Sequence, residues 1–384
     1  MLPYVLPCSN ILKISIKIAN QITHCSNSWD QLLPVNHHLK TRHLLAFEQS
    51  NIEDIENYYV QVFVKTKLIG QVYLQRFLFQ HKHLNFRLDQ RFLSRLIDIF
   101  MPAQLPVLIC GHLFRINFQG FYFTHPAHQV LVFDVIQLFI LQNKNCKPAG
   151  IMIKDCSETF IAQKCSLFGY HFFNGDVTME IARRPYWLSF NDYLKDLNKK
   201  YLQRAKKIIQ AFEGIEVREL TANEILNQSF SINQLYWNVV NKQTVKLGTV
   251  NTPYFYELKK DLQQKFELHA LYKNQQMVGF YTFIFYENDM ETHYIGLDYK
   301  ANKLHKIYFN ILFLGIAKMI SSHYNKLELG RTAREAKTSA GALPKQIFNY
   351  IKVKNILVKI TLNYFLKRFN KSEDQHQINR SPLK

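Results

Sequence analysis

The sequence predicts an α/β protein built from two copies of one unit, each with a mixed central sheet. Hydrophobic residues make up 47% of the 384 residues and aromatic residues 14%, while Gly (13) and Pro (11) are sparse. This composition is typical of a folded chain that buries a sizeable core without long flexible linkers. In addition, the first half shows an order of hairpin, helix, strand, helix and strand that matches the order in the second half. Such a match indicates two diverged copies of one unit.

The first half alternates strands and helices from residue 58 onward. Apolar side chains alternate with polar ones over 58–66 and predict a strand, and Leu68-Ile69-Gly70 is interpreted as the turn into a second strand over 71–79. The further elements expected here are a helix over 91–100, a strand over 107–110, a helix over 127–142 and a strand over 150–154. Residues 1–186 are therefore assigned to the N-terminal domain.

An amphipathic helix over 189–212 is expected to connect the two units. Ser189 is a favourable N-cap, Asp192 adds a carboxylate to the first turn, and Gly214 is suited to end the helix. Apolar residues recur at spacings of three and four and form one stripe, and Lys and Arg residues cover the other surface. The basic face is interpreted as the solvated side of this helix, with a phosphate-binding rail as the alternative.

The second half, assigned to residues 187–370 with the connecting helix, repeats the order of elements. The elements expected are a buried strand over 277–286, a turn at 287–289, a strand over 292–297, a helix over 307–320 and a strand over 327–329. The tail over 371–384 is basic and predicted to be disordered, and the segment 356–369 is amphipathic and could lie on an anionic membrane.

A glycine-rich basic turn follows the last of these strands and is the most informative segment of the chain. Gly330 lets backbone amides approach a ligand closely, and the later turn at 339–342 is again made of small residues. Fixed cations at such a place suit a phosphate, a carboxylate or a developing oxyanion. The candidate binding residues of this turn are Gly330, Arg331, Thr332, Arg334 and Glu335, beside Lys337. The alternative is a helix N-terminus with a solvated basic face.

Several segments together resemble the N-acetyltransferase superfamily, and most closely its Fem-type peptidoglycan aminoacyltransferase branch. They are Ser189-Phe190-Asn191-Asp192-Tyr193-Leu194, the strand from His293 to Tyr299, Leu329-Gly330-Arg331-Thr332-Ala333-Arg334-Glu335-Ala336-Lys337, and in the first half Ser28-Trp29-Asp30 and Cys110-Gly111-His112-Leu113-Phe114. The resemblance spans most of residues 28–358 and implies two tandem acyl-CoA N-acyltransferase-type domains, the first degenerate. It also implies transfer of an acyl or aminoacyl group to an amine, with the active site in the second domain.

The resemblance leaves the donor open between an acyl-CoA and an aminoacyl-tRNA. The acetyl-coenzyme A signature of ordinary N-acetyltransferases, a basic residue or Gln followed by Gly-x-Gly or Gly-x-Ala, is missing because Arg331 follows its glycine. The partners expected are a phosphate-bearing acyl donor and an amine acceptor such as a cell-wall or lipid precursor, with tRNA or peripheral membrane contact. No obligate protein partner is evident.

Acyl transfer to an amine requires a base and a group that stabilises the tetrahedral oxyanion. Lys337 is the candidate for the oxyanion or for a substrate phosphate, because the resemblance implies a lysine at this place. His293 titrates near neutrality and is the candidate base, although a strand histidine is more often a hydrogen-bonded core residue. Tyr294 and Asp298 are expected to line the acceptor site, or else to serve hairpin and turn packing.

The charge of the chain supports a second class of function. A net charge of +19 favours an acidic partner, so a non-enzymatic module that binds nucleic acid or an anionic membrane is the alternative. Six cysteines without a CxxC motif, and histidine pairs without a carboxylate at a fixed spacing, predict no disulfide framework and no metal site. The N-terminus lacks the basic start of a signal peptide, which favours a cytoplasmic protein that could also be peripheral at the inner membrane face.

Overall fold

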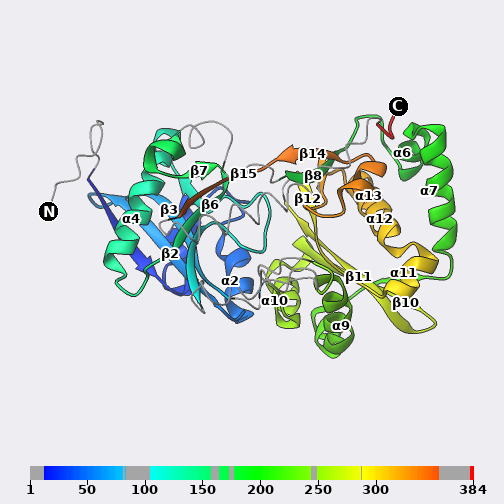
Figure 1. Cartoon of the computed structure of the whole chain (residues 1–384), viewed down its shortest axis with the longest axis horizontal. Coiled ribbons are helices and arrows are strands. Elements are labelled where there is room, and N and C mark those ends of the chain that lie inside the picture. The colour runs from blue at the N-terminus through cyan, green and yellow to red at the C-terminus, as the bar shows by residue number, and fades with distance from the viewer. Residues whose placement is uncertain are drawn as a thin grey trace, which may run out of the picture.

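The computed structural model describes residues 13–80, 83, 104–156, 164–172, 177–243, 249–286, 288–353 and 381–384. They form two lobes, each with a central sheet, placed side by side along the long axis of the molecule (Figure 1). The predicted helix over 91–100, the amphipathic segment over 356–369 and most of the predicted tail over 371–384 lie outside the described residues.

The first lobe is built on a mixed sheet with the strand order β1-β2-β3-β4-β6-β15-β7, and β5 pairs with β3. β4 and β6 are parallel, and the other neighbouring strands are antiparallel. The strands are β1 (Ile14–Ala19), β2 (Ile55–Val64), β3 (Lys67–Phe79), β4 (Leu105–Cys110), β5 (Phe121–Phe123), β6 (Gly150–Cys156), β7 (His171–Phe172) and β15 (Phe348–Val353). The helices of this lobe are α1 (Ser26–Leu32), α2 (Thr41–Gln49) and α4 (Val132–Gln142).

The second lobe repeats this plan with the strand order β14-β8-β13-β12-β11-β10-β9, in which β12 and β13 are parallel. The strands are β8 (Val177–Ala182), β9 (Glu216–Glu219), β10 (Phe266–Lys273), β11 (Gln276–Phe285), β12 (Asp289–Leu297), β13 (Lys326–Glu328) and β14 (Leu343–Gln346). The helices are α6 (Phe190–Asp196), α7 (Lys199–Ala211), α8 (Ala222–Asn227), α9 (Ser229–Val240), α10 (Thr252–Leu262), α11 (Tyr299–His305), α12 (Ile307–Ser321) and α13 (Arg334–Ser339). The predicted α/β class with mixed sheets in two units is confirmed.

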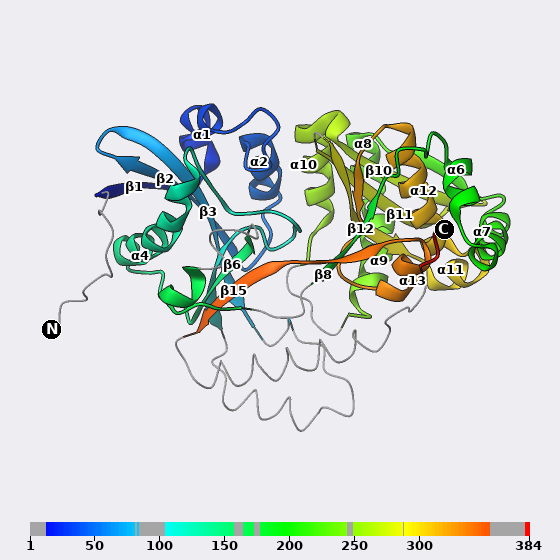
Figure 2. The ribbon, with the colours of Figure 1, turned by 90° about the horizontal axis from the view of Figure 1, so that it is seen from above.

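Two strands do not lie in the sheet to which the predicted domain boundary assigns them. β8 precedes residue 186 in the sequence but pairs with β13 and β14 in the second sheet. β15 follows the whole second lobe but pairs with β6 and β7 in the first sheet (Figure 2). The second sheet therefore begins with a strand just before the predicted boundary, and the first sheet is completed by a strand from the C-terminal part of the chain. The linear assignment of 1–186 and 187–370 does not describe the sheets.

Two local predictions are wrong in detail. The first hairpin turns at Lys65 and Thr66, with Lys65 in the left-handed region (φ 53°), while Gly70 lies within β3. A Cβ atom at Gly70 would lie 2.2 Å from the Phe123 ring, so this glycine serves close packing of β5. The connecting helix over 189–212 is two helices, because Leu197 is extended (ψ 139°) and pairs with Leu383 between α6 and α7.

Separate cores cover the two faces of the second sheet. Helices α6, α7 and α12 bury one face, and α8, α9 and α10 bury the other. The latter core continues into the first lobe, where Phe47 of α2 and Phe114 join the cluster that contains Tyr254 and Phe255. α10 accordingly lies beside α2 in both views (Figures 1 and 2). The contact between the lobes is an apolar core, which fixes their relative placement.

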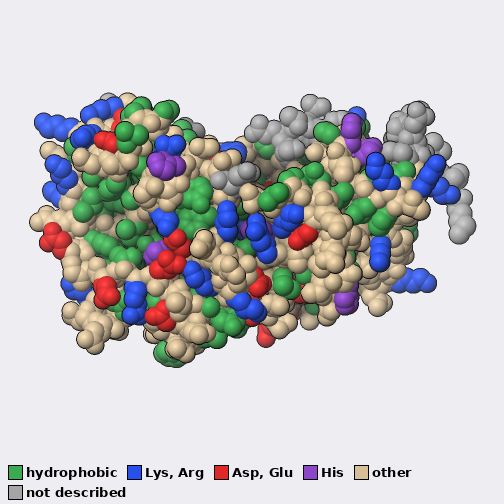
Figure 3. All heavy atoms as spheres, turned by 180° about the vertical axis from the view of Figure 1, so that it is seen from behind, with side chains coloured by type: hydrophobic (Ala, Val, Ile, Leu, Met, Phe, Trp, Pro, Cys, Tyr) green, Lys and Arg blue, Asp and Glu red, His purple; other side chains and the backbone are tan. Residues whose placement is uncertain are grey.

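The surface carries the positive charge in scattered groups. On the face drawn in Figure 3, Lys and Arg side chains gather near the middle of the molecule and alternate with acidic and apolar side chains elsewhere. Among the described residues, no single helix has the length and apolarity needed to cross a membrane. Helices α11 and α12, which are bent by 69° relative to each other, together meet these two criteria of length and composition.

Candidate active site

A cavity of about 680 Å³ opens where the two parallel strands of the second sheet separate. β12 and β13 pair over three positions, ending with Glu291 opposite Glu328, after which β12 continues and β13 gives way to the Gly330 turn. The residues of both strands beyond this rung line the cavity. A bulge in β12, where the register with β11 shifts next to Tyr281, adds local twist at the same level. The loss of strand pairing thus creates the site.

Glu328 is the buried carboxylate at the floor of the cavity. It is 4% exposed and ends β13. Its Oε1 accepts hydrogen bonds from the Thr178 hydroxyl and from the Gly330 backbone N–H (2.6 Å), and its Oε2 accepts one from Asn117 Nδ2 (2.7 Å). Burial is the main reason why the pKa of Glu328 is raised to about 7. The charges of Glu291 and Glu180 also raise this pKa, whereas the hydrogen bonds from Thr178 and Gly330 lower it. A carboxyl with this pKa can accept a proton at neutral pH.

Glu291 lies on the neighbouring rung and has the opposite electrostatic environment. Burial by itself would raise the pKa of Glu291, but Arg115 and His293 lower it to about 2. Arg115 is 1% exposed, and its Nε lies 3.6 Å from Glu291 Oε2. The Tyr286 hydroxyl accepts a hydrogen bond from Arg115 and donates one to Glu291 (2.7 Å). Glu291 therefore stays ionised, whereas Glu328 can gain or lose a proton near neutral pH.

His293, the predicted base, belongs to this buried network. Its side chain is 1% exposed; Nδ1 lies 2.7 Å from Glu291 Oε1 and Nε2 lies 2.8 Å from the Tyr254 hydroxyl. Burial lowers the pKa of His293, and Glu291 opposes this shift. Since both ring nitrogens are engaged, His293 acts on a substrate only if one of these contacts opens, and its role as base stays a prediction.

The Gly330 turn carries Lys337 to the cavity wall. Gly330 has φ 85°, a conformation suited to glycine, and Ala333 (φ 53°) turns the chain into α13. Lys337 Nζ donates to the Gly330 carbonyl oxygen at 3.1 Å. Although Lys337 follows a turn, it is only 4% exposed.

The other predicted binding residues divide into two groups. Tyr294, Gly330, Arg331 and Thr332 line the cavity together with His293 and Lys337. Asp298 caps α11 by accepting hydrogen bonds from two backbone N–H groups, which is a structural role, and it does not line the cavity. Arg334 and the exposed Glu335 are likewise not among its lining residues.

The lining of the cavity combines cationic side chains with apolar and aromatic ones. Lys303 and Lys306, both exposed, lie at the junction of α11 and α12, where the first turn of α12 faces the cavity. Lys242 adds a third cation over the Tyr299 ring, 3.1 Å from its centroid. The apolar wall is lined by Leu113, Phe114, Ile116, Tyr236, Val239 and Val240. The arrangement fits a ligand with a phosphate at one end and an apolar or aromatic part at the other.

Sequence reasoning missed Glu328, Glu291, Arg115 and Asn117. The signal for Glu328 was present, since a carboxylate between Leu327 and Leu329 in a buried strand is unusual. Nothing local marks Arg115 and Asn117, because their partners lie more than a hundred residues away in the other lobe.

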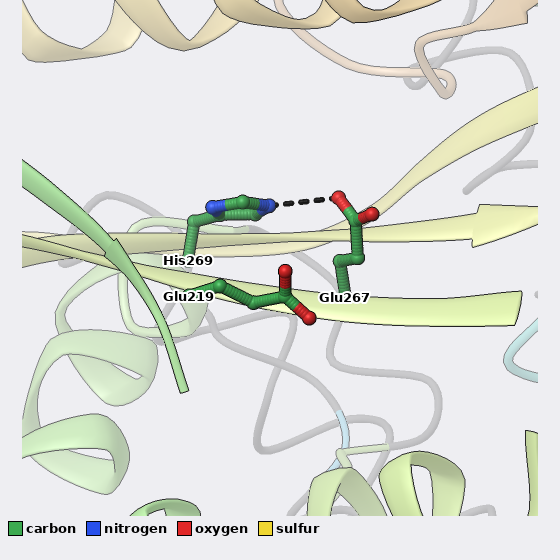
Figure 4. Close-up of side chains that lie close together, drawn as sticks. All are labelled: Glu219, Glu267 and His269. Carbon is green, nitrogen blue, oxygen red and sulfur yellow. Dashed lines mark hydrogen bonds and ion pairs between the residues drawn. The ribbon is translucent and has the colours of Figure 1, made fainter. Parts of the chain in front are cut away.

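One group of side chains within the described ranges has the composition of a metal site. Glu219, Glu267 and His269 place their ligand atoms within 4.8 Å of one another at the edge of the second sheet (Figure 4). However, Lys259 lies 2.6 Å from Glu219, and Lys318 lies 2.7 Å from Glu267. These ammonium groups already neutralise the carboxylates, so the cluster is an ion-pair network that covers the sheet edge.

Comparison with known proteins identifies the fold. FemX matches with a TM-score of 0.51 and 9% identity, over 87% of this chain and 97% of that chain. A tandem GNAT protein from the clavulanic acid biosynthesis pathway matches with a TM-score of 0.51 and 8% identity, over 89% and 98%. A conserved protein of unknown function from Bacteroides thetaiotaomicron matches with a TM-score of 0.51 and 10% identity, over 88% and 100%. No protein-family model and no curated protein matches the chain. The predicted tandem N-acetyltransferase-type fold is confirmed.

Proposed function

We propose that this protein is an N-acyltransferase whose single working site is the cavity between β12 and β13. The observation that carries the proposal is Glu328, a buried carboxyl with a pKa of about 7 on the wall of a cavity formed by separating strands. An amine is protonated in water and must lose a proton before it attacks a carbonyl carbon. The fold shared with FemX and with the tandem GNAT protein supports this reaction class.

The proposed reaction assigns a role to the charged residues of the cavity. Lys303 and Lys306, with the first turn of α12, bind the phosphate of the acyl donor. The acceptor amine enters beside Glu328, its nitrogen attacks the acyl carbonyl carbon, and Glu328 takes the proton released. Lys337 offsets the negative charge that develops on the carbonyl oxygen. The bond to the donor then breaks, and the protonated Glu328 gives its proton to the leaving oxygen or sulfur, which restores the carboxylate.

A donor screen tests the proposal. The purified chain is incubated with acyl-CoA thioesters or with a mixture of aminoacyl-tRNAs, each with radiolabelled acyl groups and a panel of primary amines. Label transferred to an amine in one of the two arms, and lost in Glu328→Gln, supports the proposal and identifies the donor class. Transfer that is equal in Glu328→Gln, or no transfer in either arm, counts against it.

Helix α7 favours a second candidate, the binding of an anionic surface or nucleic acid without catalysis. This helix of 13 residues exposes Lys199, Lys200, Arg204, Lys206 and Lys207 on one side. Binding of this kind is spread over many cations and falls steeply with salt. Salt-dependent retention of anionic vesicles or RNA that is lost on charge reversal along α7, and unchanged in Glu328→Gln, would favour this candidate.

A further inference from the structure

A loop of the first lobe forms part of the wall of the second lobe's cavity. It leaves β4 after Cys110, and Leu113, Phe114 and Ile116 line the cavity. The ends of the loop are in close contact, because a Cβ atom at Gly120 would lie 2.2 Å from the Gly111 nitrogen. The loop therefore returns on itself and presents its tip to the other lobe.

Buried charges of the first lobe fix the shape of this loop. Lys154 Nζ, 2% exposed, donates to the backbone oxygens of His112 (2.8 Å) and Arg115 (3.0 Å). Asp155 Oδ2 accepts a hydrogen bond from the Phe118 backbone N–H at 2.9 Å. At the tip, the Arg115 guanidinium contacts Glu291 and Tyr286 of the second lobe. A loop held in this way on both sides is preorganised.

Asn117, two residues after Arg115, contacts the candidate base Glu328. Its side-chain Nδ2 donates to Glu328 Oε2 at 2.7 Å, whereas the other two donors to Glu328 belong to β8 and to the Gly330 turn of the second lobe. Asn117 is exposed and has φ 56°, a left-handed conformation that asparagine tolerates well. We propose that Asn117 is a positioning residue, supplied by the first lobe, that holds the Glu328 carboxylate for acyl transfer in the second lobe.

The proposal rests on the proposed function, in which Glu328 is the base. A donor on Oε2 fixes the carboxylate rotamer, so that the remaining lone pair of that oxygen keeps one direction. It also stabilises the ionised form against burial and against the negative charges of Glu291 on β12 and Glu180 on β8. Cations share this environment: Lys326 and Lys345 pair with Glu180, and Arg331 and Lys337 line the same cavity. The first lobe is thus part of the catalytic site of the second.

The test uses substitutions that keep the backbone conformation of residue 117. Asn117→Gly removes the side chain and retains the left-handed conformation without strain. Asn117→Asp keeps the shape and replaces the donor by a like charge. Asn51 provides the matched control, since it is also exposed, left-handed (φ 47°) and in the first lobe, and its Nδ2 donates locally, to the Gln49 oxygen. Asn51→Gly should leave every measured property of the site unchanged.

Two measurements are made on each variant of the full chain. Infrared titration follows the Glu328 carboxyl band, assigned by its loss in Glu328→Gln, and kcat/KM is measured against pH with the donor found in the screen. Asn117→Gly should raise the pKa of the Glu328 carboxyl by about one pH unit and lower kcat about tenfold at pH 6.5, with KM little changed. Asn117→Asp should shift the carboxyl titration further in the same direction.

The outcomes separate this proposal from the proposed function. Equal carboxyl titrations and equal pH profiles in Asn117→Gly and the unmodified chain overturn the positioning role of Asn117 while leaving Glu328 as base. Full activity in Glu328→Gln overturns the proposed function, and with it the positioning role, whatever the titration shows. A pH profile that shifts equally in Asn117→Gly and in Asn51→Gly also overturns the proposal, because the effect is then not specific to the contact.

Discussion

Replacing Glu328 by Gln should make the protein less active and more stable at once. The substitution keeps the size and shape of the side chain and removes its charge. In Glu328→Gln the side-chain carbonyl oxygen can accept from Thr178 and Gly330 as before, and the exposed Asn117 can turn its own oxygen toward the new amide. The folded packing is therefore preserved, so that a loss of activity reports on proton transfer. A missing general base costs about 10²–10⁴-fold in rate.

The stability effect follows from the pKa of the buried carboxyl. The pKa of Glu328 is about 7 in the folded state against 4.5 in the unfolded chain, so the folded protein binds more protons between these two values. Stability is consequently lost as the pH rises from 4.5 to 7, and above pH 7 the full penalty applies, which is about 3 kcal/mol. At pH 5 the penalty is about 1 kcal/mol. Glu328→Gln lacks this penalty and should gain stability mainly at pH 8.

Urea denaturation at pH 5 and pH 8 measures this gain, beside kcat/KM for the same preparations. Glu267→Gln is the matched control, since Glu267 is also a buried strand glutamate of the second sheet, but His269 and Lys318 lower its pKa in spite of burial. The control should lose stability at pH 8 and keep its activity. If Glu328→Gln retains full activity, Glu328 is not the base; if its stability gain is equal at the two pH values, the carboxyl is not desolvated as argued.

Three further changes test the remaining parts of the site. Lys337→Ala should lower kcat on the order of a hundredfold, because it removes a cation from the oxyanion. Because Lys337 is buried, the same variant should also lower the free energy of unfolding by about 1–3 kcal/mol. Lys337→Met, which keeps the aliphatic stem of the side chain, should restore stability in thermal melts but not turnover. Lys303→Ala combined with Lys306→Ala should raise KM for the donor and weaken its dependence on salt, with kcat unchanged, as steady-state kinetics at several ionic strengths would show. Gly330→Ala should lower the free energy of unfolding by about 1 kcal/mol, because residue 330 has φ 85°, and should misplace the N–H that binds Glu328. Thermal melts and kinetics equal to those of the unmodified chain would contradict the role of the turn.

Periodicity alone predicted the elements on which the site is built. The pattern predicted the bounds of the buried strand β11, the strand β12 and the apolar helix α12 to within a few residues, because the patterns of these elements are local and strong. The Gly330 turn was also predicted, since a glycine after a short strand requires no distant partner. Interactions between residues that are close in sequence determine these elements, so a single sequence is enough to predict them.

The features that sequence reasoning missed depend on residues far apart in the chain. β8 and β15 are ordinary short strands, and nothing in their composition shows that β8 belongs to the second sheet and β15 to the first. The break between α6 and α7 depends on residues 381–384, where the Asn198 backbone N–H donates to the Pro382 oxygen at 2.8 Å. A helical stripe that continues across 197–198 cannot reveal such a contact. Long-range pairing therefore limits what one sequence predicts about strand pairing and helix ends.

The pair of glutamates on the last rung shows why the site needs both lobes. Glu291 and Glu328 are the same residue type, lie opposite each other on adjacent strands and are both at most 4% exposed. Two buried carboxylates opposite each other on adjacent strands would share one proton if their surroundings were alike. The first lobe makes their surroundings different, because Arg115 gives a full positive charge to Glu291 and Asn117 gives only a neutral donor to Glu328. Burial is the main reason why the pKa of Glu328 is raised toward neutrality, where a base for an amine is useful, and the charge that stays on Glu291 adds to this shift. A second lobe on its own would keep both carboxylates, but it would lack the part of the cavity wall that Leu113, Phe114 and Ile116 form and the asymmetry that assigns the proton to one carboxyl.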